Sequence, residues 1–373
     1  MSADLRRSEE QLELASMMGA LLTKHSDSGA VRAAAESSCG YDEKLWTLLC
    51  AQVGVAALGI PEEYGGAGFG FLETAVVLEQ LGQALTPAPL LSGVVAAEVL
   101  LRTGDRSACE RLLPAIAAGS VATVAWAGPS GMSDAPQTVE LVDDRLTGTV
   151  PLVLDGDTAE VLLVAAQISD GVGLFEVATD ADRLTRTATA AMDLTLRLAT
   201  VQLEGVEGTR IGGDLTAALR EVHAVGAAAV AALQVGVAQR ALDMTVAYSK
   251  EREQFGRQIG SFQALKHRMA DMLVLVETAR SAAMDAAFAV PADIDLVRRT
   301  SVAKGWCSDA LTEVASEMVQ LHGGIAITWE HDAHLVFKRA HSLSHLFGPP
   351  HLHRRTVMPP PDALPDRPTR PRD

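Results

Sequence analysis

The spacing of hydrophobic and polar positions changes twice along the chain. Up to about residue 115, apolar residues recur at helical intervals, as in Leu45 to Val53, a stretch that we expect Gly54 to end. From about residue 119 to 212 the pattern becomes short β-like runs separated by turn residues. Helical spacing returns from Asp214 to about Leu346. The sequence therefore predicts an α+β protein with a β region between two helical regions.

These changes of period divide the chain into three predicted domains and a tail. We expect an N-terminal helical domain over residues 1–117, a middle β domain over 118–213 and a C-terminal helical domain over 214–356. Residues 357–373 are rich in proline and are expected to be disordered.

Some element ends can be predicted more closely. Ser8 followed by Gln11 is a capping box that should open the first helix. Another helix is expected to begin at Pro291 and to run towards Gln320. The β-like runs, expected to form a small barrel or sandwich, include Val121 to Trp126, Thr138 to Val142, Val161 to Ala165 and Val172 to Val177.

Composition and charge narrow the range of partners. The 373 residues are 48% hydrophobic and carry a net charge of −16, which argues against nucleic acid or an anionic membrane surface as a partner. We find no apolar run that reaches the ~18 residues needed to cross a membrane. The four cysteines are scattered, which is typical of reduced thiols in a cytoplasmic protein.

The run from Ser249 to Gln263 carries the most specific chemistry. It places Arg252 near Phe255 at the junction of two apolar helices. A guanidinium is a planar fork of donors that suits a diphosphate. The alternative is an ordinary helix end with mixed charges, but that does not account for Gly256 and Gly260, since glycine is unfavourable inside helices.

Two further segments accompany this run. Ile60 to Gly68 is a glycine-rich loop that is followed by Leu78 to Gly82, and Gln320 to Gly324 contains a glycine pair that lets backbone approach a ligand. In this order the segments resemble the signatures of the acyl-CoA dehydrogenase family, and the resemblance covers nearly the whole chain apart from the tail. It implies an N-terminal helical domain, a middle β-barrel domain and a C-terminal four-helix bundle.

The resemblance also implies a cofactor and the residues that contact it. In this family Arg252 would contact the diphosphate of FAD, and Phe255 and Ile259 would pack on the cofactor. Gln320 and Gly324 would touch its adenine end. Family members make these contacts across a subunit interface, to the FAD of the neighbouring subunit, so the resemblance predicts an oligomer as well.

The catalytic base of the family is missing from its usual positions. The family oxidises an acyl-CoA thioester, for which a carboxylate removes a proton and FAD accepts a hydride. Without gaps, the usual base position falls on Phe347 and the alternative position on Gly226, and neither residue can take a proton. Glu221 and His345 remain as unusual candidates for the base.

The segments that would face the flavin ring also depart from the family. Trp126 to Asp134 and Leu152 to Leu154 stand where the family has threonine- and tryptophan-containing segments, and Leu154 cannot donate a hydrogen bond. The chain therefore resembles the base-less subunit of heterotetrameric (α2β2) acyl-CoA dehydrogenases, such as those that degrade sterol side chains. A homologous subunit would supply the base, and an electron-transfer flavoprotein is the expected electron acceptor.

Other functions stay open at this point. The chain could be a self-sufficient homodimeric dehydrogenase with an unusual base, or a non-redox structural or acyl-CoA-binding relative. His341 and His345 lie four residues apart, a spacing that metal ligands use. Their surroundings are basic, with Lys338 and Arg339 nearby, so we predict solvated or interface histidines and no metal site.

Overall fold

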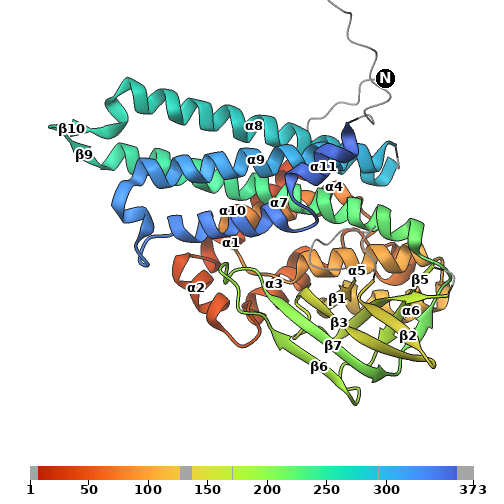
Figure 1. Ribbon diagram of the computed structural model, residues 1–373. Coiled ribbons are helices and arrows are strands. Elements are labelled where there is room, and N and C mark those ends of the chain that lie inside the picture. Colours follow the sequence, from red (N-terminus) through yellow and green to blue (C-terminus); the bar gives the residue numbers. More distant parts are fainter. Residues whose placement is uncertain (1–6, 127–136, 170, 293, 359–373) are drawn as a thin grey trace, which may run out of the picture.

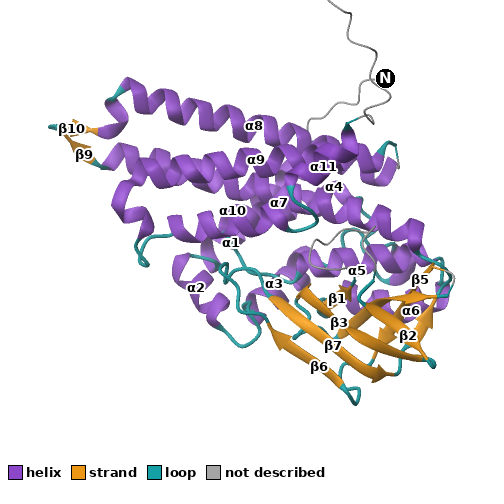
Figure 2. Cartoon of the chain, in the orientation of Figure 1, coloured by secondary structure: helices purple, strands orange, loops and turns teal. Residues whose placement is uncertain are grey.

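The computed structural model describes residues 7–126, 137–169, 171–292 and 294–358. The strands of a β-sheet lie between two helical regions in the sequence, so the predicted α+β class is confirmed (Figures 1 and 2). Most of the predicted tail lies outside the described residues, and its disorder stays a prediction.

The N-terminal region is helical, and local chemistry fixes its ends. The Ser8 hydroxyl accepts the N–H of Gln11 (3.2 Å), and the Gln11 side chain accepts the N–H of Ser8 (3.1 Å), so the capping box is confirmed. Gly54 ends α3 with φ of 70°. The elements are α1 (Glu9–His25), α2 (Ser28–Glu36), α3 (Glu43–Val53), η1 (Glu62–Tyr64), α4 (Phe71–Ala84), α5 (Leu90–Thr103) and α6 (Arg106–Ala117).

Among the described residues, the middle of the chain forms one eight-stranded sheet. Its order is β6-β7-β3-β2-β4-β5-β8, with β1 paired to β4. β1 and β2 run parallel to β4, and the other neighbouring strands are antiparallel. The strands are β1 (Ala122–Ala125), β2 (Val139–Val142), β3 (Arg145–Leu154), β4 (Val161–Ile168), β5 (Gly171–Val177), β6 (Leu184–Ala188), β7 (Leu198–Val206) and β8 (Thr209–Ile211).

The sheet encloses a core of its own, which includes Val139, Leu162 and Val201. The four runs given as examples correspond to β1, β2, β4 and β5, and the structure adds β3, β6, β7 and β8 in the same region. The register of β3 shifts between Val150 and Val153, and this irregularity breaks the alternation of apolar and polar residues.

The C-terminal region returns to long helices. It contains α7 (Thr216–Glu251), β9 (Glu253–Gln254), β10 (Arg257–Gln258), η2 (Ile259–Ser261), α8 (Gln263–Ala292), α9 (Leu296–His322), η3 (Gly323–Ile327), α10 (Ala333–His345) and α11 (Pro350–Val357). The expectation that Pro291 opens a helix was wrong. Pro291 lies in the last turn of α8, where it removes one N–H without stopping the helix, and the next helix begins at Leu296.

Helix α7 forms the centre of the molecule, and α4 crosses it at close range. A Cβ added to Gly236 would lie 1.9 Å from the Glu79 carbonyl oxygen, and one added to Gly82 would lie 2.3 Å from the Leu233 carbonyl oxygen. α7 is long and apolar enough to cross a membrane by length and composition alone, contrary to the sequence-based expectation, but 94% of the 18-residue window that meets this test is buried inside the protein. It is the core helix of the fold.

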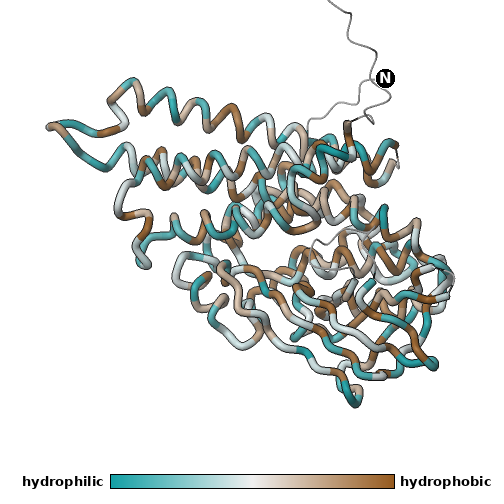
Figure 3. The backbone as a smooth tube through the Cα atoms, in the orientation of Figure 1, coloured by the Kyte–Doolittle hydropathy of each residue, from teal (hydrophilic) through white to brown (hydrophobic). Residues whose placement is uncertain are grey.

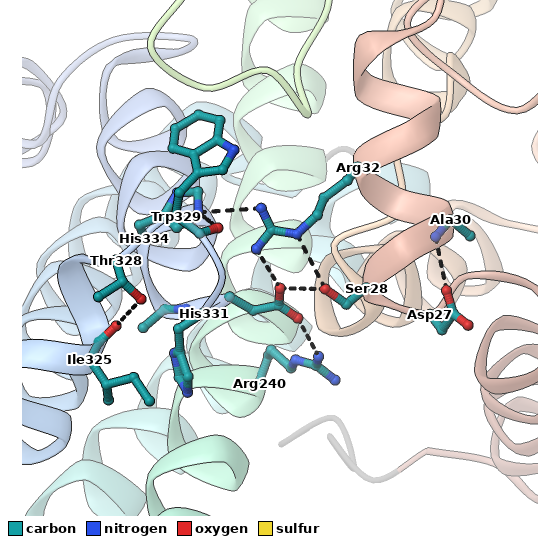
Figure 4. A network of polar contacts seen from close by, with 12 residues as sticks. Asp27, Ser28, Ala30, Arg32, Arg240, Ile325, Thr328, Trp329, His331 and His334 are labelled. Atoms are coloured by element: carbon teal, nitrogen blue, oxygen red, sulfur yellow. Dashed lines mark hydrogen bonds and ion pairs between the residues drawn. The ribbon is translucent and has the colours of Figure 1, made fainter.

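Ion pairs fasten the regions to one another. The Asp332 carboxylate, just before α10, accepts hydrogen bonds from Ser28 and Arg32 of α2 (2.5 and 2.9 Å) and lies 3.5 Å from the Arg240 guanidinium of α7 (Figure 4). Buried Arg339 of α10 donates to the Thr195 carbonyl oxygen (2.7 Å) in the segment before β7. α10 is therefore held against both the N-terminal helices and the sheet.

Candidate functional site

The predicted cofactor-contacting run forms a short hairpin between α7 and α8. Gln254 pairs with Arg257 across β9 and β10. Phe255 and Gly256, between them, both have positive φ (54° and 74°), as a two-residue type I′ turn requires. The N–H of Ile259 donates to the Arg252 carbonyl oxygen (2.8 Å) and closes the base of the hairpin.

The side chains of this hairpin are exposed, although the Phe255 ring meets the Phe262 ring edge-on, with centroids 6.2 Å apart. Phe255 is 92% exposed at the tip, although asparagine or glycine would fit such a turn with less strain. Arg252 is exposed, and among the described residues no ion pair engages it. In Figures 1 and 3 the hairpin projects from the end of the helical region. An exposed aromatic in a strained turn indicates a contact outside this chain.

The second predicted segment lies at the same end of the bundle. Tyr248, near the end of α7, stacks on His322, near the end of α9, with ring centroids 4.5 Å apart. Gln320 is exposed, and a Cβ added to Gly324 would meet nothing within 4 Å. The five predicted cofactor residues are thus brought to one exposed end of the molecule.

A cavity of about 290 Å³ lies between the sheet, α5 and the connection from α10 to α11. Leu152 and Phe347 line opposite walls, and both have left-handed backbone (φ of 57° and 55°), which bulky residues adopt at a cost. Other apolar residues that line it are Val95, Val124, Trp126, Leu154, Leu196 and Leu198.

Phe347 and Gly226, the two positions without a base, contact each other. A Cβ added to Gly226 would lie 2.3 Å from a ring carbon of Phe347. The ring is 4% exposed and lies near Trp126 (6.2 Å between ring centroids) and His223 (5.7 Å). The Phe347 ring therefore fills the space that a side chain at position 226 would need.

Two buried basic residues hold the turn that carries Phe347. The Lys304 ammonium group donates to the carbonyl oxygens of Ser344 and Gly348 (both 3.1 Å) and to the Ser308 hydroxyl (3.0 Å). His353 contacts the Phe347 carbonyl oxygen through Nε2 (2.7 Å), so that nitrogen carries the proton. Burial lowers the pKa of Lys304 to about 7 and that of His353 to about 4.

Sequence reasoning did not find Lys304, His353 or His223. For Lys304 a signal was present, because Thr300, Ser301 and Ser308, which share its helix face, are all small. A lysine on such a face is buried and must find acceptors for its protons. His223 and His353 stack at 6.0 Å between ring centroids, although 130 residues separate them in the sequence.

The comparisons with known proteins cover the same regions as the resemblance. The model of the acyl-CoA dehydrogenase N-terminal domain matches residues 8–120, and that of the C-terminal domain matches residues 215–359. Acyl-CoA dehydrogenase IpdE2 of Mycolicibacterium smegmatis is 44% identical over 347 residues, which is 92% of this chain and 96% of that protein. The chain belongs to the acyl-CoA dehydrogenase family.

Solved structures agree with this assignment. The ChsE4-ChsE5 complex from Mycobacterium tuberculosis is similar with a TM-score of 0.86 and 30% identity, over 95% of this chain and 97% of that chain. A variant of the steroid ACAD Tcur3481-Tcur3483 has a TM-score of 0.83 and 31% identity, over 94% and 96% of the two chains. The predicted acyl-CoA dehydrogenase fold and oxidoreductase class are confirmed.

The two unusual bases considered for this acyl-CoA dehydrogenase lie in different places. Glu221 is half exposed, pairs with Arg102 at 3.2 Å and does not line the cavity. His345 lines the cavity beside His341, with ring centroids 4.9 Å apart. Burial, aided by the nearby charge of His341, lowers the pKa of His345. Among the described residues, no three His, Cys, Asp or Glu side chains gather as a metal site would need.

Acyl-CoA dehydrogenases generally depend on FAD, and the cavity and the hairpin of this chain suit such a cofactor differently. Two hydroxyls at the cavity point into the protein: Thr123 donates to the Leu154 carbonyl oxygen (2.6 Å), and Ser92 donates to the Asp155 carboxylate (2.5 Å). The described cavity walls therefore do not fit the polar edge of a flavin ring. Residues 127–136, most of the segment expected to face the ring, lie outside the described residues. The exposed guanidinium of Arg252 has the forked donors that a diphosphate needs.

Proposed function

We propose that this chain is the base-less subunit of a heteromeric, FAD-dependent acyl-CoA dehydrogenase. The observation that carries the proposal is the contact of Phe347 with Gly226, because Phe347 cannot take a proton and a carboxylate side chain at position 226 would have to displace its buried ring. A homologous partner subunit would then supply the base that takes the α-proton of the acyl-CoA thioester.

The hairpin gives this chain its role in the complex. Arg252 would neutralise the diphosphate of an FAD held mainly by the partner, and Phe255 and Ile259 would cover that cofactor. Gln320 and Gly324 would border its adenine, where the absence of a Cβ leaves room for close approach. FAD, when bound, accepts the hydride from the β-carbon. The residues of this chain bind and orient the cofactor and exclude water from it.

The relatives suggest the assembly and the substrate. One similar structure is a complex of two different chains, ChsE4 and ChsE5, and another is a steroid ACAD. We therefore propose an α2β2 heterotetramer that oxidises a bulky, ring-containing acyl-CoA. An electron-transfer flavoprotein would accept the electrons, and the cytoplasm is the expected location.

The FAD content of the purified protein tests the proposal. The chain would be produced alone and together with a homologous acyl-CoA dehydrogenase that retains the usual glutamate, and flavin would be measured by absorbance after gel filtration. We expect no retained FAD for the chain alone and one FAD per unlike pair in the complex. Full flavin occupancy and turnover by the chain alone would instead show a self-sufficient enzyme.

A matched pair of arginine variants tests the role of the hairpin. Arg252→Ala in the complex should lower the affinity for FAD by about ten- to a hundredfold, since a charge-assisted contact to phosphate contributes roughly 1.5–3 kcal/mol. Arg298→Ala, which removes an exposed arginine at the start of α9, should leave FAD binding unchanged. Equal FAD affinity in both variants would contradict the proposed contact and would favour a non-redox relative.

A further inference from the structure

The cavity beside Phe347 is a formed, apolar space, although its walls suit a flavin poorly. Its volume of about 290 Å³ is roughly ten times the share of one water molecule in the liquid, so it can take a group of about ten non-hydrogen atoms. Trp126, Leu152, Leu198 and Phe347 supply its walls from the sheet and from the turn after α10. Two of these, Leu152 and Phe347, keep left-handed backbone to do so.

The polar side chains around this cavity differ in whether a hydrogen bond within the protein already engages them. The hydroxyls of Ser92 and Thr123 are engaged within the protein, at 2.5 and 2.6 Å. His341 and His345 lie on one face of α10 at the cavity, and both side chains remain exposed. No hydrogen bond within the described part of the chain engages either imidazole ring. A neutral histidine ring has one N–H to offer to an acceptor.

The electrostatic surroundings of this histidine pair favour an oxygen ligand. The charges that act on His345 come from His341, Lys304 and His351, all of them basic. Such surroundings favour a ligand with an electron-rich oxygen over one with a cationic group. Apolar walls with one or two polar groups that fix orientation are the usual composition of a small-molecule site.

We infer that this cavity is a second, non-reacting ligand site that binds an apolar ring or branched acyl group through van der Waals contact, with His345 donating a hydrogen bond to an oxygen on that group. The inference rests on the proposed function, because the cavity is free for such a ligand only if this chain does not hold the flavin ring itself. The ligand is not oxidised there, since the cavity has neither a carboxylate base nor the donors that would hold the flavin ring among its described lining residues.

Two fluorinated fragments that differ in one oxygen can test this site. The flavin-free chain would be titrated with 5-fluoro-1-indanone and with 5-fluoroindane, which lacks the carbonyl oxygen, and binding would be followed by fluorine NMR line broadening. Both fragments are close to the size that the cavity admits. We expect saturable binding of the ketone that is about fivefold tighter than that of the hydrocarbon, as one neutral hydrogen bond provides.

Three variants locate the binding. Leu152→Trp should abolish binding of both fragments by filling the cavity, and it should still fold because Leu152 is 42% exposed. His345→Phe should weaken the ketone about fivefold without affecting the hydrocarbon. His267→Phe, which changes an exposed histidine of α8 that does not line the cavity, should change neither.

The outcomes separate this inference from the proposed function. Fragment binding that persists in Leu152→Trp, or a ketone that binds no better than the hydrocarbon, would overturn the second site while leaving the subunit role intact. A parallel titration with FAD tests the other part. If FAD binds the chain alone at one equivalent and displaces the ketone, the cavity is the flavin site of this chain, and both the proposed function and this inference fail.

Discussion

The two ends of the C-terminal helical region treat the family's functional positions in opposite ways. At the hairpin, Arg252 is exposed, and Phe255 is 92% exposed despite its edge-on contact with the Phe262 ring. At the cavity, Phe347 and Gly226 are buried against each other, and the exposed His341 and His345 are the titratable side chains among the described lining residues. The hairpin end exposes a cation and an aromatic ring to solvent. The cavity end buries an aromatic ring against a glycine and has no base at either position.

This difference shows which constraints act on each end. Side chains that serve a partner need not stabilise their own chain, so they can occupy strained or solvent-exposed positions. At the cavity end the corresponding positions are filled by close packing, here an aromatic ring over a glycine. The contrast predicts that substitutions at the cavity end change stability, whereas substitutions at the hairpin change cofactor retention.

The largest effect is expected from Phe347→Ala. Removing the buried ring should lower the free energy of unfolding by about 3 kcal/mol, at the low end of the usual range because one side of the ring already faces a cavity. Urea unfolding followed by tryptophan fluorescence would measure this. A loss below about 0.5 kcal/mol would mean that the ring is not part of the core.

Gly226→Ala should destabilise the protein by about 1–3 kcal/mol, because the new methyl group overlaps the Phe347 ring. In a Phe347→Leu background the same change should become neutral or stabilising, since alanine is favoured over glycine in a helix by up to about 1 kcal/mol. The double-mutant cycle measures this coupling directly. Equal effects in the two backgrounds would show that the two positions do not interact.

Lys304→Met should alter how stability depends on pH. Burial lowers the pKa of Lys304 to about 7 in the folded chain, against about 10.4 in an unfolded one. Between these values the unfolded chain binds more protons at this site, so the site makes stability rise with pH, by up to about 1.4 kcal/mol per pH unit. Urea unfolding of wild type and variant at several values in this window should therefore diverge. Parallel profiles would mean that Lys304 stays charged, held by its three oxygen acceptors.

Phe255→Asn should have the smallest effect on stability and the opposite sign. Asparagine suits the first position of a type I′ turn, so the isolated chain should gain about 0.5 kcal/mol. The complex with a partner should retain less FAD, measured as flavin absorbance after gel filtration. A stability loss as large as that of Phe347→Ala would show that the ring packs within its own chain.

Sequence reasoning reached the elements whose signals are local. The capping box at Ser8 and the end of α3 at Gly54 depend on neighbouring residues, so they could be predicted. The sequence also showed, for each of the two positions separately, that no base is present. The contact between the two positions was not visible, because it depends on how α7 and the turn after α10 meet across 121 residues of sequence.

The errors have equally specific causes. Proline was taken as the start of a helix at Pro291, but the last turn of α8 tolerates the missing N–H. The apolar stretch of α7 was interrupted too often by polar residues to stand out, although its composition reaches that of a membrane span. Burial of Lys304 could have been inferred from its helix face, but its acceptors at Ser344 and Gly348 could not, because they lie about 40 residues further along the chain.

The hairpin has a consequence for how the subunits would find each other. Its shape is set by backbone hydrogen bonds within one chain, between β9 and β10 and from Ile259 to Arg252. The tip that carries Phe255 is thus formed before any partner arrives, and little conformational entropy remains to be lost on association. Assembly can then proceed as the docking of two rigid bodies, at a rate limited by encounter and orientation and not by folding of the contact loop.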